Sequence, residues 1–185
     1  MILTTKSGWI ESICGPMFSG KTKELQRRVR LARIAKQKVQ VFKPTIDDRF
    51  KIEEVVDHDR GSMPCSPVSS STELLSKVHD DTDVVAVDEV QFFSEQLARD
   101  LNSLANRGKR VVAAGLNGDW RAEPFPTVSL VLAHSESVDF FLAVCFNCGD
   151  PAAFSHLISG EGPRVQVGAS DKYQALCRTC RFRGA

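Results

Sequence analysis

The sequence lacks two features that would place it at a membrane. It contains no run of about 18 consecutive apolar residues, which is the length that a membrane-spanning helix needs. Its first residues also lack an apolar core of signal-peptide length. We therefore expect a cytoplasmic protein with no membrane partner.

The sequence also has no excess of either charge. Lys and Arg total 24 and Asp and Glu total 23, which gives a formal net charge of +1. Proteins that coat nucleic acid usually carry a clear basic excess. The balance argues against a nucleic-acid partner, although it permits a local basic patch. The densest basic stretch, residues 27–38, favours a solvated helix face or a subunit contact over such a patch.

Cysteine is scarce, with six in 185 residues, which is too few for a disulfide scaffold. A chain of this length predicts one domain, or one domain with a small appendage. Hydrophobic residues make up 42% of the chain and charged residues 25%, as in an average folded protein rather than a disordered one.

Short apolar runs rich in valine and isoleucine recur along the chain, each closed by a polar or glycine-containing turn. Runs of this length predict buried strands rather than helices. They are residues 9–14, 38–42, 84–87, 110–114 and 140–144. The strand rhythm stops near Cys145, so we expect an α/β domain over residues 1–140 and a second, smaller unit over residues 141–185.

Helical patterns separate these runs. One begins after Lys21, and one is predicted to start at Ser70, which with Glu73 resembles a capping box. A third is expected over residues 95–106 with Ser94 as its N-cap. Its apolar face comprises Leu97, Leu101, Leu104 and Ala105. Strands that alternate with helices predict a mostly parallel sheet with helices on both faces.

Residues 15–22, Gly-Pro-Met-Phe-Ser-Gly-Lys-Thr, match the phosphate-loop pattern G-x-x-x-x-G-K-[ST]. Glycines let backbone N–H groups surround an oxyanion, and the following helix adds the positive end of its dipole. Lys21 can neutralise the outer phosphates and the Thr22 hydroxyl can bind Mg²⁺. A chance turn is the alternative, but a strand before and a helix after favour a P-loop, RecA-like fold.

An acidic pair, Asp88-Glu89, follows the apolar run at residues 84–87. A strand that ends in an acid is the usual partner of a phosphate loop, and the Asp holds Mg²⁺. Glu89 is a candidate general base for the oxygen that attacks the γ-phosphate. By itself the pair is also compatible with an ordinary acidic turn. The spacing leaves open whether the attacking oxygen belongs to water, as in an NTPase, or to a substrate, as in a kinase.

Two C-x-x-C pairs lie in the C-terminal part of the chain. They comprise Cys145 with Cys148 and Cys177 with Cys180, separated by 28 residues. Two such pairs can complete a closed, tetrahedral, structural Zn²⁺ site. A redox dithiol and two disulfides are the competing interpretations, and both fit a cytosolic chain less well.

Taken together, these motifs and several others resemble the zinc-containing (type II) thymidine kinases, in order from about Gly8 to Cys180. The matching stretches are residues 14–22, Phe42-Lys43-Pro44, Asp47-Asp48-Arg49-Phe50, His58-Asp59, Asp88-Glu89-Val90-Gln91-Phe92-Phe93, Ala114-Gly115-Leu116, Pro124-Phe125, Val167-Gly168-Ala169, Tyr173 and Cys177-Arg178-x-Cys180.

The resemblance implies transfer of the γ-phosphate of ATP to the 5′-hydroxyl of thymidine, which gives thymidine monophosphate for DNA synthesis. Glu89 would be the base that takes the hydroxyl proton. The residues implied at the ATP phosphates are Gly15, Pro16, Met17, Phe18, Ser19, Gly20, Lys21, Thr22, Arg49, Asp88 and Gln91. Those implied in the Mg²⁺ shell are Thr22, Asp47 and Asp88.

The resemblance also implies a nucleoside pocket closed by a lasso over residues 165–173, which grips the base through main-chain groups. The residues implied at the nucleoside are Met17, Phe92, Trp120, Phe125, Ser155, Val165, Gln166, Val167, Gly168 and Tyr173. The four cysteines would bind structural zinc. Members of the family are usually homotetramers inhibited by thymidine triphosphate.

The chain departs from the family pattern in three places. Trp120 stands where phenylalanine is expected, and Asn117-Gly118-Asp119 replaces a stretch that is expected to begin with Asp. Ser155 stands where a threonine often faces the thymine methyl group, which predicts a looser methyl contact.

Two other function classes stay open from the sequence. A zinc-ribbon P-loop ATPase stimulated by nucleic acid would use the basic stretch and the cysteine pairs. A zinc-stabilised nucleotide-binding regulator would lack catalysis, and the presence of Glu89 beside Asp88 argues against it.

Overall fold

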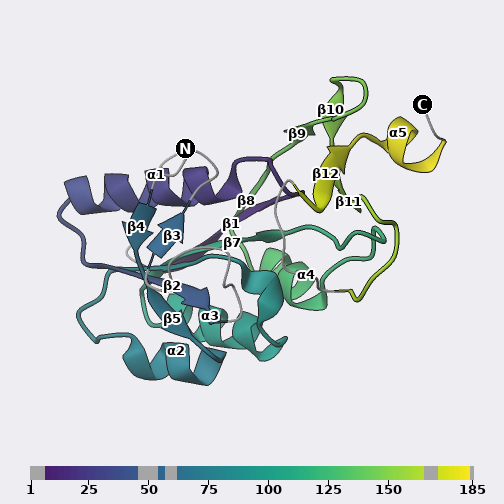
Figure 1. The fold of residues 1–185 in the computed structure, drawn as a ribbon. Coiled ribbons are helices and arrows are strands. Elements are labelled where there is room, and N and C mark those ends of the chain that lie inside the picture. The colour runs from purple at the N-terminus through teal and green to yellow at the C-terminus, as the bar shows by residue number, and fades with distance from the viewer. Residues whose placement is uncertain (1–6, 46–53, 57–61, 165–170, 184–185) are drawn as a thin grey trace.

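The computed structural model describes residues 7–45, 54–56, 62–164 and 171–183. Six parallel strands form a central sheet in the order β5-β2-β6-β7-β1-β8 (Figure 1). These strands are β1 (Trp9–Gly15), β2 (Val39–Pro44), β5 (Ser66–Val68), β6 (Val84–Val87), β7 (Arg110–Leu116) and β8 (Ser137–Phe140). The expected parallel sheet is therefore confirmed.

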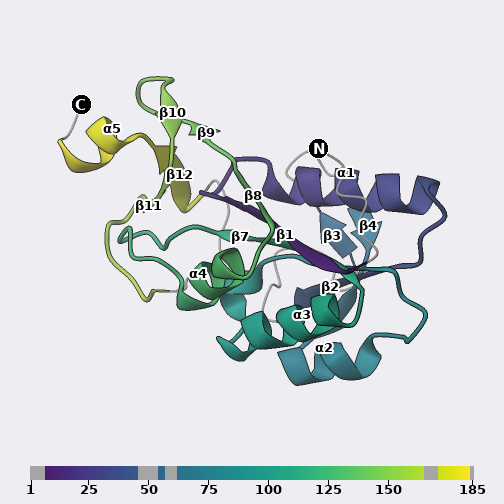
Figure 2. The same ribbon diagram turned by 180° about the vertical axis from the view of Figure 1, so that it is seen from behind.

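Helices cover both faces of this sheet. One face carries α1 (Lys21–Ile34), and the other carries α2 (Ser71–Lys77), α3 (Gln96–Asn106) and α4 (Pro126–Ala133), as seen from behind in Figure 2. Alternate residues of the strands enter two apolar cores. In β6, for example, Val84 and Ala86 pack toward α1, while Val85 and Val87 pack toward the other helices. Burial on both faces explains why the strands read as continuous apolar runs.

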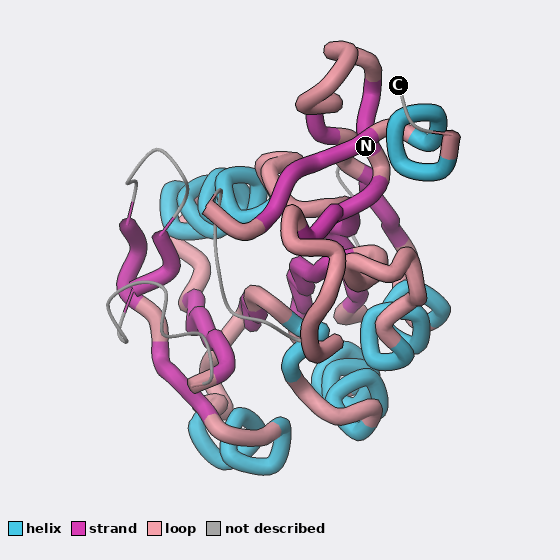
Figure 3. Tube along the Cα trace, turned by 45° about the vertical axis from the view of Figure 1, so that its right-hand side comes forward, coloured by secondary structure: helices cyan, strands magenta, loops and turns pink. Residues whose placement is uncertain are grey.

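A separate set of short elements follows the central sheet. They are β9 (Ala143–Val144), β10 (Pro151–Ala152), β11 (Phe154–Leu157), β12 (Tyr173–Leu176) and α5 (Arg178–Phe182). Two antiparallel pairs, β9 with β10 and β11 with β12, form within this C-terminal unit. The unit lies beyond the carboxyl end of β1, away from the pair β3 (Glu54–Val56) and β4 (Ser62–Pro64), which Figure 3 shows at the left edge of the molecule.

The predicted helix ends are only partly correct. Ser70 caps α2 and accepts a hydrogen bond from the backbone N–H of Glu73 at 3.2 Å, as expected. The prediction for Ser94 is wrong, because α3 has Glu95 at its N-cap and no side chain caps it. The helix nevertheless buries the predicted apolar face and ends before Gly108, whose φ of 88° suits the turn.

The prediction of a single buried strand over residues 140–144 is also wrong. Here β8 ends at Phe140 in the central sheet, and β9 starts at Ala143 in the C-terminal unit. Phe140 and Val144 are exposed rather than core residues. Apolar content alone suggested burial, but this stretch runs from the end of β8, an edge strand among the described residues, to the C-terminal unit.

Within the described part of the chain, no helix combines the length and the apolar character that a membrane span requires.

Candidate functional site

The phosphate loop at residues 15–22 joins the end of β1 to the start of α1. Its chain turns tightly, because both Phe18 (φ 65°) and Gly20 (φ 85°) adopt the left-handed conformation. The carbonyl oxygen of Pro16 accepts hydrogen bonds from Lys21 Nζ at 2.6 Å and from Ser19 Oγ at 2.8 Å. The loop thus holds the buried ammonium group of Lys21 beside the N-terminus of a 14-residue helix. A positive charge and a helix N-terminus together form a suitable binding site for phosphate.

Asp88 lies next to this loop, although it is 66 positions from Thr22 in the sequence. The Thr22 hydroxyl donates a hydrogen bond to Asp88 Oδ2 at 3.1 Å. The contact arises because β6 and β1 both flank β7 and all three run parallel, so their carboxyl ends meet at one edge. A hydroxyl and a carboxylate in contact are the donor types that hold Mg²⁺ at a phosphate loop.

Burial, together with the neighbouring charge of Glu89, raises the pKa of Asp88 to about 7. Hydrogen bonds from Thr22 and the backbone of Glu89 act in the opposite direction, but they do not offset the loss of water. A cation at this position would favour the charged carboxylate. The site is therefore better suited to a metal-bound state than to an empty one.

Glu89 has a strained backbone with a φ of 53°, a conformation that is uncommon for residues other than glycine. Gln91 fixes its side chain, because Gln91 Nε2 donates a hydrogen bond to Glu89 Oε2. Gln91 Oε1 in turn accepts from the backbone N–H of Leu116 at 3.1 Å. Strain of this kind concentrates at functional sites. Gln91 and Leu116 thereby fix the orientation of the Glu89 carboxylate, as the role of general base requires.

A small apolar cluster adjoins the phosphate loop. It consists of Met17, Leu157 and Tyr173, with Phe18, Leu116 and Trp120 packed against it. Three of the residues predicted at the nucleoside thus lie together. Of the others, Ser155 is buried beside Met17, Phe92 is half-buried, and Phe125 packs mainly into the core between the sheet and α3 and α4.

The four predicted zinc ligands also come together. The sulfur atoms of Cys145, Cys148, Cys177 and Cys180 all lie within 4.8 Å of one another. Cys148 Sγ and Cys177 Sγ are 3.7 Å apart. A tetrahedral zinc with Zn–S bonds of about 2.3 Å places its sulfurs about 3.8 Å apart, so the cluster fits this metal. Two turns present the ligands, one through Gly149 (φ 80°) and the other at the start of α5.

The loop between β7 and α4 contains a contact that the sequence did not reveal. Asp119 has a side chain that is only 1% exposed, and its Oδ2 accepts a hydrogen bond from Arg164 Nε at 2.9 Å. The same loop also contacts the residue before Arg164, because Trp120 Nε1 donates a hydrogen bond to the carbonyl of Pro163 at 3.0 Å. The unexpected Asn117 also takes part, since its Nδ2 donates to the carbonyl of Ala153 at 3.0 Å. No local motif marks such pairs, because the partners are 36 to 45 residues apart.

Several predicted site residues lie outside the described part of the chain. They are Asp47, Arg49, Val165, Gln166, Val167 and Gly168. Their roles at the phosphates, the Mg²⁺ shell and the lasso stay predictions.

The basic stretch of α1 divides into an exposed and a buried part. Arg30, Arg33 and Lys36 are exposed, as a solvated helix face predicts. Arg28 is buried and pairs with Glu24 at 2.9 Å and with Glu11 at 2.9 Å. A buried, paired guanidinium is unavailable to nucleic acid.

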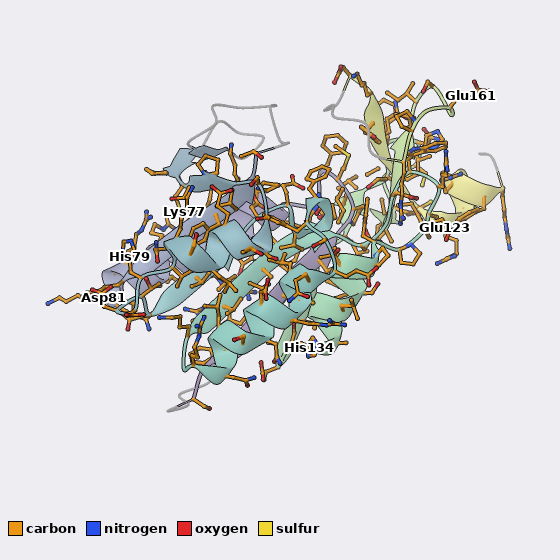
Figure 4. All side chains as sticks on the ribbon, turned by 90° about the horizontal axis from the view of Figure 1, so that it is seen from below. Lys77, His79, Asp81, Glu123, His134 and Glu161 are labelled. Atoms are coloured by element: carbon orange, nitrogen blue, oxygen red, sulfur yellow. The ribbon has the colours of Figure 1, made fainter. Side chains whose placement is uncertain are left out.

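Two histidines lie at the amino ends of the parallel strands, away from the site, because His79 precedes β6 and His134 precedes β8. Figure 4 shows His79 and His134 away from the end of the molecule that carries Glu123 and Glu161. Glu123 belongs to the loop between β7 and α4, and Glu161 belongs to the C-terminal unit. The sequence assigned no role to these histidines, and their positions give them none at the site.

Comparison with known families agrees with this geometry. A family model described as thymidine kinase matches residues 8–181, which is most of the chain. The match extends from β1 through the phosphate loop and the acidic pair to α5. The chain therefore belongs to the thymidine kinase family, and its cluster of four cysteines fits the zinc-containing, type II members.

Proposed function

We propose that this protein transfers the γ-phosphate of ATP to the 5′-hydroxyl of thymidine, forming thymidine monophosphate for DNA precursor synthesis. One observation carries the proposal. Met17 belongs both to the phosphate loop and to the apolar cluster with Leu157 and Tyr173. An anion site and an apolar site therefore share a wall, as a kinase for an aromatic nucleoside requires and an NTPase that uses water does not.

On this proposal most of the site residues position the substrates, and one residue accepts a proton. The phosphate loop and Lys21 bind the ATP phosphates, and Thr22 and Asp88, together with Asp47, hold Mg²⁺. When bound, Mg²⁺ supplies charge neutralisation at the phosphates. Glu89, held by Gln91, accepts the proton of the 5′-hydroxyl. Arg49 completes the phosphate site. Phosphoryl transfer needs this kind of positioning more than covalent help.

The nucleoside is proposed to lie against Met17, Trp120 and Tyr173. Phe92, Phe125 and Ser155 would complete its surroundings, and the lasso that begins at Val165 would close over the base. Because the cluster is apolar, it suits a neutral pyrimidine and excludes water that would otherwise hydrolyse ATP.

We assign the structural zinc to the four cysteines and divide the chain into a nucleotide-binding domain, residues 1–140, and a zinc-binding lid, residues 141–185. The end of β8 at Phe140 and the start of β9 at Ala143 support this division. Zinc would tie β9 to the end of β12, because Cys145 and Cys177 directly follow those strands.

We also propose a homotetramer, with thymidine triphosphate as its end-product inhibitor. Support for self-association comes from β8, which is an edge strand of the sheet within the described part of the chain. Alternate apolar side chains along this edge and the segment after it are exposed, namely Val138, Phe140, Leu142 and Val144. An open edge with an apolar stripe is a typical surface for subunit contact. The expected location of the enzyme is the cytoplasm.

The alternative is a zinc-ribbon ATPase stimulated by nucleic acid, and the burial of Arg28 argues against it. An ADP-release assay separates the two functions. Thymidine should raise ADP release at least tenfold, whereas single-stranded DNA and RNA should leave it unchanged. Stimulation by DNA without an effect of thymidine would favour the ATPase. Deoxyuridine, measured in the same assay, tests how strictly the Ser155 site distinguishes the methyl group.

A further inference from the structure

Ser155 connects the C-terminal unit directly to the phosphate loop. Its hydroxyl oxygen accepts a hydrogen bond from the backbone N–H of Met17 at 3.0 Å, and the side chain is buried. Ser155 lies on β11 opposite Ala175 of β12, two residues before Cys177. A residue of the unit that contains the four cysteines therefore contacts a backbone group of the loop expected to bind ATP.

The peptide unit that Ser155 holds is also the one that holds the lysine. In a trans peptide the C=O and N–H groups point in opposite directions. On one side of this unit, Met17 N–H points to Ser155. On the other side, Pro16 C=O accepts from Lys21 Nζ at 2.6 Å and from Ser19 Oγ at 2.8 Å. Rotation of the unit away from Ser155 would therefore also move the acceptor that keeps Lys21 inside the loop.

Two neighbouring contacts limit how this part of the loop can move. A Cβ atom on Gly15 would lie 2.2 Å from the carbonyl oxygen of Phe141, so the segment that leaves β8 fits closely against the loop. Phe18 packs against the core around Cys145 and Cys177. The bond from Met17 to Ser155 acts from outside the loop on the peptide unit between Pro16 and Met17, whose carbonyl Lys21 and Ser19 hold from within the loop.

We propose that Ser155 is a positioning residue for the phosphate loop, beyond its expected place beside the thymine methyl group. Its hydroxyl sets the orientation of the peptide between Pro16 and Met17, so that Lys21 is held in the loop before the nucleotide arrives. The inference rests on the proposed function only for the identity of the nucleotide as ATP. It predicts that a substitution in the C-terminal unit alters nucleotide binding more than nucleoside binding.

The test uses two variants of nearly equal shape. Ser155→Thr keeps the hydroxyl, whereas Ser155→Val replaces it with a methyl group and leaves Met17 N–H without its acceptor. We expect Val to weaken Mg-ADP binding by isothermal titration calorimetry about tenfold and to raise KM for ATP similarly, because a buried N–H without a partner is costly. Thr should stay within twofold of wild type. KM for thymidine should differ between the two variants by less than threefold.

Ser159→Ala serves as the matched control, since this exposed hydroxyl donates only to a neighbouring carbonyl, that of Glu161, at 2.9 Å. Equal ADP affinity in the Thr and Val variants would overturn the inference. So would a change confined to thymidine. If Val does not fold, amide hydrogen exchange of wild-type protein without nucleotide decides. Slow exchange at Met17 supports the bond, and exchange as fast as in an open loop contradicts it.

A failure of the proposed function can be distinguished from a failure of this inference about Ser155. ADP titration requires no thymidine, so it tests Ser155 even if the wild-type protein proves unable to phosphorylate thymidine.

Discussion

At the scale of single residues, the site depends on side chains whose positions their neighbours determine. Glu89 has a left-handed backbone, and its carboxylate is held by Gln91, which is itself held by Leu116 N–H. This series of hydrogen bonds fixes the direction of the carboxylate. Thr22 and Asp88 likewise contact each other. The residues expected to do chemistry are thus held in place by other residues of the chain.

Glu89→Gln tests the base. The amide keeps the size of the side chain but cannot accept the hydroxyl proton, so kcat for thymidine should fall by about 10²- to 10⁴-fold. Mg-ADP affinity should change by less than threefold, because the phosphate loop is intact. Steady-state kinetics and calorimetry measure the two effects. A variant with near-normal kcat would remove Glu89 from the role of base.

At the scale of elements, a partly buried ion-pair network joins β1 to α1, β7 and β8. Glu11 Oε1 accepts from Arg110 Nε at 2.8 Å, and Glu11 Oε2 accepts from Arg28 Nη1 at 2.9 Å. Arg28 also pairs with Asp139 of β8. Although burial alone would raise the pKa of Glu11, hydrogen bonds from Arg110 and Trp9 and the charge of Arg28 lower it. The network therefore holds the strand before the phosphate loop to its neighbours.

Glu11→Gln should destabilise the fold in a pH-dependent way. The lowered pKa means that ionised Glu11 stabilises the folded state above its unfolded pKa of about 4.3 and loses this effect as the pH falls through the folded pKa. At pH 7 the free energy of unfolding should fall by about 2 kcal/mol. The difference from wild type should shrink below pH 4. Urea titrations at pH 7 and pH 3.5 measure it.

The control for this experiment is Glu161→Gln, which removes an exposed carboxylate at the far end of the molecule (Figure 4). It should leave unfolding unchanged at both pH values. A loss of stability in Glu11→Gln that stays the same at pH 3.5 would show that the charge of Glu11 is not the cause.

At the scale of the whole molecule, strands β1, β2, β6 and β7 of the central sheet could be predicted from sequence, whereas β5, β8 and the contacts between the parts of the molecule could not. Runs such as residues 84–87 are apolar because both faces of the sheet are covered by helices. They can therefore be recognised in the sequence as buried strands. The phosphate loop and the cysteine pairs have fixed spacings that chemistry dictates. The pairs Met17–Ser155 and Asp119–Arg164 have no such spacing, since folding brings together residues 138 and 45 positions apart.

The errors have a similar cause. Ser94 resembles a helix cap by residue type, yet the turn after η1 (Val90–Phe92) places Glu95 at the cap of α3. The apolar run at residues 140–144 was interpreted as core, yet it spans a sheet edge and the link to the C-terminal unit. The local amino-acid composition predicts neither the path of the chain nor whether an edge strand pairs with another strand.

Removal of zinc tests how the two parts of the molecule depend on each other. Elemental analysis should find one zinc per chain, and Cys180→Ser should lose it, because a site with three thiolates binds more weakly. Binding and folding are coupled at structural zinc sites, so the variant should melt at a lower temperature. Cys65→Ser is the control, since Cys65 lies outside the cluster. Full zinc content in Cys180→Ser would contradict the assignment.

The most direct test of the account measures both products of one reaction mixture that contains wild-type protein, Mg-ATP and thymidine. The account predicts ADP and thymidine 5′-monophosphate in equal amounts, and neither product with a thymidine analogue that lacks the 5′-hydroxyl. ADP release without thymidine monophosphate, or release that is equally fast with the analogue, would contradict it.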